Sequence, residues 1–278
     1  MNVIGLGKAG CAIADKFGEH AQYKTYKIDT ELEGKRAYKI KSQASPEAYE
    51  SNFASMKTFF RGIKGKSLLI IGGSGHISAI SLRLIQQLRD KCELDILYIK
   101  PDTFLLSESK KMHEKVTYNV LQQYTRSGAI GLMYLMSNPT LESILGEVPI
   151  MGYYEKLNEL IVSTMHMINV YRNTAPIMGG VPNFNKDSTK KICTVGIFDI
   201  KENQEKLFFP LDTVRERGYI YSISKERLQT ESDLHKTITS QMKEKSQEDN
   251  VNISFGIFST DYKNDYGYIL AYSSNIQS

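Results

Sequence analysis

The sequence of 278 residues has no apolar run long enough to cross a membrane as a helix. Its longer apolar runs, such as Ser67–Gly73, fall far short of the roughly 20 residues that a bilayer requires. The first residues, MNVIGLGKAG, lack the basic segment and long apolar stretch of a signal peptide. Three scattered cysteines form neither a zinc-site spacing nor an even disulfide set. We therefore expect a cytoplasmic protein in a reducing environment, without a membrane partner.

Strong charge of either sign is also lacking, since 35 Lys and Arg against 31 Asp and Glu leave a formal net charge of +4. The lysines are spread along the chain, with no arginine-rich arm and no basic helix carrying interleaved aromatics. Direct nucleic-acid binding is therefore not indicated. Apolar residues at 41% and charged residues at 24% are typical of a globular protein with one large domain or two packed ones.

The first half of the chain alternates between apolar strands and amphipathic helices. The run at 68–71 is continuously apolar, which is typical of a strand buried on both faces of a sheet. We predict further strands at 2–6, 23–28, 95–99 and 129–136, and helices after Gly10, at about 47–60, after Gly75 and at 108–126. This order predicts an α/β domain with helices on both faces of a parallel sheet.

The second half of the chain has a different pattern. Residues 153–171 form the longest predicted helix, and glycines and prolines at 174–188 predict a loop and a domain boundary. Beyond it we predict strands at 192–200, 218–223, 251–258 and 266–272, and a helix starting near Thr230 with Asp233 in a capping box and an apolar stripe of Leu234, Ile238 and Met242. The predicted organisation is a parallel-sheet domain over 1–150, a central helix over 151–173 and a smaller α+β domain over 174–278.

The first glycine turn, Gly5–Gly10, matches G-x-G-x-x-G between a strand and a helix. Asp29 follows about twenty residues later, after a second strand, as in dinucleotide-binding folds. Glycines let the backbone approach a phosphate, and the helix N-terminus supplies N–H donors to it. From this motif alone, a dinucleotide, another phosphate ligand and a turn that binds nothing all stay open.

The second glycine turn, Gly72-Gly73-Ser74-Gly75-His76, also follows a buried strand and opens a helix. It is not a Walker motif, since no Gly-Lys-Ser/Thr follows. Two such turns in one α/β domain can face one ligand from two sides, with amides and the Ser74 hydroxyl on the phosphate oxygens. A dinucleotide site would not need this second turn, so the pair favours a different phosphate ligand.

Several segments resemble the tubulin/FtsZ family, in family order across nearly the whole chain. Residues 7–19 look like its first nucleotide loop and helix, and 72–76 resemble its GGGTG signature. Residues 137–141 resemble the loop before the central helix, and 154–159 resemble the start of that helix. Residues 252–256 and 261–272 resemble the last two strands of FtsZ. The short length and loose motifs look more like the phage and plasmid members, of the TubZ and PhuZ kind.

The resemblance implies guanine-nucleotide binding, with GTP or GDP and nucleotide-bound Mg²⁺ as cofactors. The residues that would wrap or cradle the phosphates are Gly7, Lys8, Gly10, Cys11, Gly72, Gly73, Ser74, Gly75 and His76. The residues with other implied roles are Glu31 at the magnesium-bound phosphate end, Glu108 at the ribose, Asn138 and Asn158 at the guanine edge, and Tyr154 stacked on the base. An amide suits guanine because it offers both a donor and acceptors. From the residues alone, Asn138 could simply cap a turn and Tyr154 could belong to the core.

Two departures from the family pattern affect the implied chemistry. His76 takes the Ser/Thr position and Ile77 stands near the next family glycine, which makes the phosphate turn bulkier. In the family, a loop after the central helix inserts acids against the next subunit's nucleotide and polarises the attacking water. The matching segment, 183–187, has one acid, Asp187, which is the candidate catalytic residue. If Asp187 is only a polar loop residue, hydrolysis would be slow or absent.

The resemblance therefore implies a filament-forming protein whose subunits join head to tail, and a GTPase completed at the subunit interface. It implies a role in positioning or segregating DNA or phage particles, with a DNA-binding adaptor or a phage particle as further partner. Two alternatives stay open. One is an NAD(P)-binding oxidoreductase that uses Gly5–Gly10 and Asp29, and the other is a non-hydrolysing, FtsZ-like regulatory or binding module.

Overall fold

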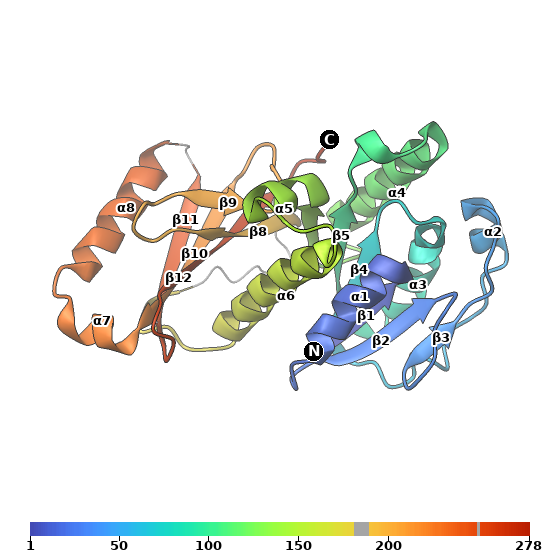
Figure 1. Ribbon diagram of the computed structural model, residues 1–278, viewed down its shortest axis with the longest axis horizontal. Helices are drawn as coiled ribbons and strands as arrows, with labels where there is room; N and C mark the ends of the chain where they lie inside the picture. Colours follow the sequence, from blue (N-terminus) through green and yellow to red (C-terminus); the bar gives the residue numbers. More distant parts are fainter. Residues whose placement is uncertain (181–188, 249–250) are drawn as a thin grey trace. The chain divides into compact units, whose positions relative to one another are not determined.

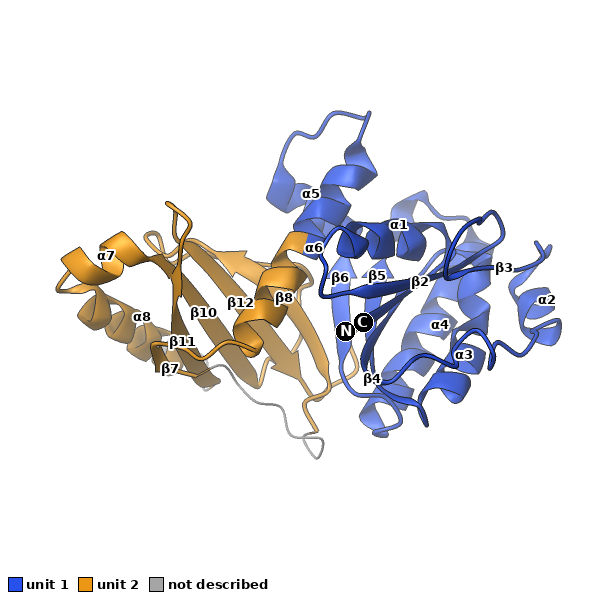
Figure 2. Cartoon of the chain, turned by 90° about the horizontal axis from the view of Figure 1, so that it is seen from below, with its two compact units in different colours: residues 1–162 blue, residues 163–278 orange. Residues whose placement is uncertain are grey.

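The computed structural model describes residues 1–180, 189–248 and 251–278. The chain divides into two compact units, Met1–Val162 and Ser163–Ser278, which Figure 2 shows in different colours. In the described part of the chain, no helix combines the length and the apolar character that crossing a membrane requires.

The first unit contains a parallel sheet with the strand order β3-β2-β1-β4-β5-β6 (Figure 1). The strands are β1 (Asn2–Leu6), β2 (Lys24–Asp29), β3 (Ala37–Lys39), β4 (Gly65–Gly72), β5 (Cys92–Lys100) and β6 (Met133–Ser137). The central strand β4 carries the apolar run Leu68–Ile71, whose side chains are at most 1% exposed. The predicted α/β class is therefore confirmed, with β4 buried on both faces as the uninterrupted run predicts.

Helices cover both faces of this sheet. They are α1 (Gly7–Gly18), α2 (Pro46–Ser51), α3 (Ser81–Leu88), α4 (Glu108–Arg126), α5 (Asn138–Leu145) and the short η1 (His76–Ile80) and η2 (Thr103–Leu105). The connections β1–α1–β2 and β4–α3–β5 run in opposite directions along the sheet, so right-handed crossovers place α1 and α3 on opposite faces. Figure 2 shows α1 on one side and α3 and α4 on the other.

The longest helix, α6 (Tyr153–Arg172), begins where the sequence predicts and ends one residue later. Its predicted stripe is buried, from Leu157 at 1% to Met165 at 8% exposure. The first half of α6 belongs to the first unit and the second half to the second unit, because the division falls after Val162.

The second unit contains a mixed sheet with the order β9-β8-β12-β10-β11-β7. The strands are β7 (Met178–Gly179), β8 (Ile192–Phe198), β9 (Glu205–Leu207), β10 (Glu216–Ser224), β11 (Asn252–Thr260) and β12 (Tyr266–Ser273). Its helices are α7 (Lys225–Thr230) and α8 (Leu234–Glu248). The predicted stripe Leu234, Ile238 and Met242 packs on Tyr219, Tyr221 and Ile223 of β10. Because side chains alternate along a strand, Ser222 faces the other way, where the Tyr171 hydroxyl of α6 lies 2.5 Å from its Oγ.

Two predicted helices have different bounds in the structure. The helix expected at 47–60 is α2, which ends at Ser51 because the Asn52 side chain and amide both bond the Ala48 carbonyl. The helix expected to start near Thr230 starts at Leu234 instead. Thr230 ends α7, where Arg227 is bonded to Glu231 and to the distant Asp265.

Candidate functional site

The candidate site lies at the carboxyl edge of the parallel sheet in the first unit. Leu6 is paired with Ile28 and with Ile71, and Gly72 is paired with Ile99, so four strands end at one level. The ends of β1 and β4 lead into the two glycine turns, and the end of β2 leads into the segment with Glu31. The end of β6 leads into Asn138 in the same way. The carboxyl edge of an open parallel sheet is where such folds bind their ligands.

The first glycine turn is tight, because α1 begins at Gly7 directly after β1. Gly7 has a φ of +71°, a left-handed backbone conformation that residues other than glycine rarely adopt. A Cβ on Gly10 would lie 2.7 Å from the Ile70 carbonyl oxygen of β4. Gly10 therefore lets α1 pack closely on β4, and the first-turn amides of α1, which have no intrahelical acceptor, lie at the carboxyl edge. The Lys8 side chain is exposed at this end of the helix.

The Cys11 thiol points into the protein. Its Sγ lies 3.5 Å from the Gly5 carbonyl oxygen and 3.6 Å from the Ile28 carbonyl oxygen, and the residue is 5% exposed. Burial raises the pKa of the Cys11 thiol to about 12, so it is neutral at physiological pH. The side chain fills the space between β1 and β2, and the amide of Cys11, as the fifth residue of α1, lies within the hydrogen-bonding pattern of the helix.

Three hydrogen bonds fix the backbone of the second glycine turn. The Gly73 amide donates to the Ile99 carbonyl at 3.0 Å. The Gly75 carbonyl accepts from the Ser78 amide at 2.9 Å and from the Ser78 hydroxyl at 2.7 Å. Within residues 1–180, 189–248 and 251–278, the amides of Ser74 and Gly75 have no acceptor. These two donors are therefore available to an anion at the start of η1.

Two neighbouring residues on α4, which were not predicted from the sequence, lie next to this turn and the strand beside it. The Nε2 atom of His113 lies 2.9 Å from Ser78 Oγ and 3.3 Å from the Gly75 carbonyl oxygen. Burial lowers the pKa of His113, which favours the neutral ring. The next residue, Glu114, is 4% exposed and accepts a 3.0 Å hydrogen bond from the Tyr98 hydroxyl. Burial raises the pKa of the Glu114 carboxyl, and that of the Tyr98 hydroxyl as well.

Tyr98 lies directly against the second glycine turn. A Cβ on Gly73 would be 2.3 Å from the Tyr98 hydroxyl oxygen, a distance that no side chain tolerates. Packing against Tyr98 therefore favours glycine at position 73. No sequence signal separates Tyr98 from the other apolar residues of its strand, or His113 and Glu114 from a solvated helix face.

The side chain of Ile77 lies between the two glycine turns. Its Cγ2 is 2.7 Å from the place of a Cβ on Gly7 and 3.5 Å from the place of a Cβ on Gly75. The bulk that the sequence analysis expects at this position therefore faces the space where the two turns meet. Gly72 approaches the first turn too, since a Cβ there would contact the Ala9 Cβ at 3.4 Å.

The remaining candidate residues are polar or aromatic, and Glu108, Asn138, Tyr154 and Asn158 lie on helices of the first unit. Glu31 is exposed after β2, and Glu108 begins α4 with its carboxylate 2.8 Å from the Lys111 ammonium. Asn138 is the first residue of α5. Tyr154 is 68% exposed, with its ring centroid 5.1 Å from that of Tyr153, and Asn158 lies half-buried one helical turn further along α6.

Two ion pairs and a hydrogen bond join the start of α6 to the last turn of α1 and to α5. The Lys16 ammonium of α1 lies 3.3 Å from the Glu155 carboxylate and 3.9 Å from that of Glu159. The Tyr153 hydroxyl donates to Glu142 of α5 at 2.8 Å, and burial together with this contact raises the pKa of Tyr153 to about 12. The helix that carries Tyr154 and Asn158 is therefore joined to both α1 and α5.

Asp187, the candidate catalytic residue, lies outside the described residues. In the part of the chain that is described, no group of three or more His, Cys, Asp or Glu side chains is placed to hold a metal ion. The donors at the carboxyl edge are amides, hydroxyls and lysine, and they fit a phosphate ligand whose own oxygens would carry Mg²⁺.

The chain resembles known proteins in structure but not in sequence. The sequence matches no protein-family profile and no curated protein. Solved structures match over 98% of this chain. A GTPγS-form protofilament of TubZ from Bacillus thuringiensis serovar israelensis has a TM-score of 0.72 at 14% identity, with 86% of that chain covered. The FtsZ W319Y mutant from M. jannaschii has a TM-score of 0.71 at 11% identity, with 90% covered. CetZ1 from Haloferax volcanii, a GDP-bound monomer, has a TM-score of 0.69 at 13% identity, with 93% covered. The chain therefore has the tubulin/FtsZ fold, as a divergent form whose likeness to TubZ, FtsZ and CetZ1 extends over almost its whole length.

Proposed function

We propose that this chain binds GTP or GDP at the carboxyl edge of the β1–β6 sheet and assembles head to tail into filaments. The observation that carries the proposal is the pairing of the two glycine turns, which meet around Ile77 at the ends of adjacent strands. The first-turn amides of α1 and the amides of Ser74 and Gly75 supply donors from two directions. A single dinucleotide fingerprint needs one such turn, so the pair favours a nucleotide phosphate chain.

The proposed contacts of the nucleotide are those that the resemblance to the tubulin/FtsZ family implies. Lys8 and the Ser74 hydroxyl meet phosphate oxygens, and Glu31 lies toward the end that carries Mg²⁺. Glu108 contacts the ribose, Tyr154 stacks on the base, and Asn138 and Asn158 read its edge. GTP would supply the γ-phosphoryl group, and Mg²⁺ on its oxygens would neutralise their charge. Asp187 of one subunit would orient the water at the next subunit's nucleotide.

The proposed cellular role is the positioning or segregation of DNA or of phage particles, with an adaptor or the particle as partner. Structures described as TubZ protofilaments and two-stranded filaments support self-association as the starting point. A heterologous contact that does not close into a ring produces a filament, which suits such a role.

A non-hydrolysing module is the second candidate function, and Ile77 favours it. A methyl group between the phosphate turns leaves less room for a γ-phosphoryl group and its water than a glycine would. In that case GTP binds without phosphate release, and Asp187→Ala leaves the GTP affinity unchanged. If the first proposal holds, Asp187→Ala abolishes phosphate release and leaves nucleotide affinity unchanged.

Light scattering and electron microscopy with GTP, GDP and a slowly hydrolysed analogue test the proposal. We expect GTP-dependent scattering above a critical concentration and filaments on the grid. The informative variant is Gly75→Ala, because its Cβ would meet Ile77 Cγ2 at an ordinary 3.5 Å and so leaves the fold intact while narrowing the cradle. Gly180→Ala, where a Cβ meets nothing within 4 Å, is the matched control. A monomer at every concentration, with or without GTP, would refute filament formation.

A further inference from the structure

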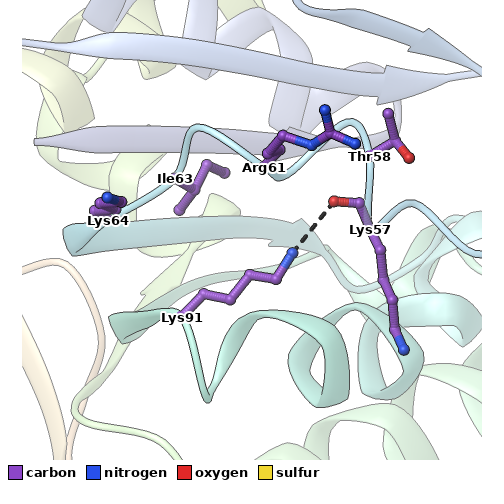
Figure 3. Close-up of a pocket in the computed structure, with 6 residues that line it drawn as sticks. All are labelled: Lys57, Thr58, Arg61, Ile63, Lys64 and Lys91. Atoms are coloured by element: carbon purple, nitrogen blue, oxygen red, sulfur yellow. Dashed lines mark hydrogen bonds between the residues drawn. The ribbon is translucent and has the colours of Figure 1, made fainter.

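A cavity of about 450 Å³ opens at the amino edge of the first unit's sheet, away from the glycine turns (Figure 3). It is lined by Lys57, Thr58, Arg61, Ile63, Lys64 and Lys91. The segment 57–64 leads into β4, and Lys91 directly precedes β5. Gly65 and Cys92, the first residues of these strands, are paired with each other. The cavity therefore lies at the start of β4, whereas the second glycine turn lies at its end.

Four of the six lining residues are cations. Among the residues that the structure describes, no carboxylate lies within ion-pair distance of Lys57, Arg61, Lys64 or Lys91. Like charges gathered in a hollow raise the local potential and attract an anion.

The walls of the cavity are fixed by hydrogen bonds and by buried side chains. The Lys91 ammonium donates to the Lys57 carbonyl at 3.2 Å, as the dashed line in Figure 3 shows. The Asn2 side chain of β1 donates to the Lys64 carbonyl at 2.9 Å. Phe60 and Ile63, at 0% and 2% exposure, anchor the segment in the core. The cations therefore project from a segment with a defined backbone path.

The donor set suits a phosphate group better than a single carboxylate. Arg61, Lys64, Lys91 and Thr58 come from separate positions around the cavity, whereas the Lys57 side chain points away and its carbonyl faces Lys91 (Figure 3). A phosphate monoester offers three terminal oxygens and up to two negative charges, a strand of DNA offers one charge on each successive phosphate, and an arginine fork matches the geometry of both. A carboxylate has two oxygens in one plane and one charge, which would leave most of these cations without a counter-charge.

We propose that this cavity is a second anion site, which binds phosphate groups through Arg61, Lys64 and Lys91. The phosphate comes either from a free phosphorylated molecule or from the phosphodiester backbone of DNA. The site is separate from the nucleotide site, because the eight residues of β4 between the two edges span about 23 Å. This inference does not rest on the proposed function and holds whether or not GTP binds at the glycine turns.

The test compares wild-type protein with Arg61→Gln/Lys64→Gln, and with Lys236→Gln/Lys243→Gln as the matched control. All four of these side chains are exposed, so neither variant disturbs the core. The probes are pyrophosphate by calorimetry and a short labelled DNA duplex by fluorescence anisotropy, both with GDP in excess to occupy the glycine turns. A polyglutamate peptide is the third probe, and GTP affinity is measured in parallel.

We expect the cavity variant to bind pyrophosphate, the duplex or both at least tenfold more weakly than the wild type, with GTP affinity unchanged. For the duplex, the slope of log K against log salt falls in magnitude by about 2, one for each lost phosphate contact. Loss of pyrophosphate binding alone identifies a small phosphorylated ligand, and loss of duplex binding identifies the DNA backbone. The proposal is overturned if the wild type binds neither probe, if both variants behave alike, or if polyglutamate binds the cavity as tightly as the phosphates.

Discussion

The Cγ2 methyl group of Ile77 lies 2.7 Å from the position that a Cβ atom would occupy on Gly7. The two glycine turns are therefore in contact through one aliphatic side chain at the carboxyl edge of the sheet. Ile77→Ala removes this methyl and opens the space between the turns. We expect GTP to bind about fivefold more tightly to this variant, a gain of about 1 kcal/mol, because less reorganisation precedes binding. Calorimetric titration measures this, with the half-buried Ile253→Ala of the second unit as control. Unchanged or weaker affinity would show that Ile77 does not obstruct the ligand.

Gly73 and Tyr98 give a prediction about stability. Gly73→Ala places a Cβ 2.3 Å from the Tyr98 hydroxyl oxygen, so the turn or the ring must move. We expect the free energy of unfolding to fall by about 1–3 kcal/mol, the usual cost of overpacking. Adding Tyr98→Phe removes the clashing oxygen and should recover part of this loss. Denaturant unfolding compares the variants, with Gly180→Ala as a glycine substitution in open space. Strictly additive losses in the double variant would contradict direct contact.

The buried Glu114 predicts a pH dependence of stability. Burial raises the pKa of its carboxyl in the folded state above the unfolded value. The folded protein then binds the proton more tightly, so this contribution to stability is complete below the unfolded pKa and is lost as pH rises through the folded pKa. Glu114→Gln cannot ionise and still accepts from Tyr98. We expect its stability relative to wild type to increase as pH rises above the ordinary value of 4.5, by about 1.4 kcal/mol in total for each unit of pKa difference. A difference independent of pH would mean that Glu114 has an ordinary pKa.

His113 predicts a change at the second glycine turn itself. In the neutral ring, Nε2–H can donate to Ser78 Oγ or to the Gly75 carbonyl. His113→Leu removes this donor, and we expect weaker GTP binding with faster amide hydrogen exchange at 73–78. His113→Gln keeps a donor and should restore part of both. Burial lowers the pKa of His113 in the folded state, so wild-type stability decreases as pH falls below the ordinary histidine value. Equal behaviour of the Leu and Gln variants would exclude a hydrogen-bonding role.

The elements that the sequence predicts well are those with long, uninterrupted periodicity. The helix predicted at 108–126 is α4 at the same residues, and the stripe of α6 is buried as predicted. The three-residue strand β3 was not predicted, because a short polar edge strand has no apolar run of its own. The break between α7 and α8 depends on Arg227 meeting Asp265, which follows almost forty residues later. Such tertiary contacts do not show in local patterns.

Some residues of the candidate site could be predicted from the sequence, and others depend on tertiary packing. The glycine turns and Asn138 follow strand ends, so parallel-sheet topology alone brings them to one edge, as the sequence analysis expects. The support from Tyr98, His113 and Glu114 could not be predicted, since it depends on which face of α4 packs under the second turn. The basic cavity could not be predicted from the charge pattern of the sequence for a similar reason. Lys91 comes from a different loop, and only the fold places it beside the segment 57–64.

The most direct test of the central claim is a titration of the purified protein with GTP and, separately, with NADH. If the two glycine turns face one phosphate chain, as we propose, GTP binds at least tenfold more tightly than NADH does. The same titration on Gly75→Ala should weaken GTP binding while Gly180→Ala leaves it unchanged. Tighter binding of NADH than of GTP, or no binding of GTP by the wild type, would contradict the assignment of a guanine-nucleotide site.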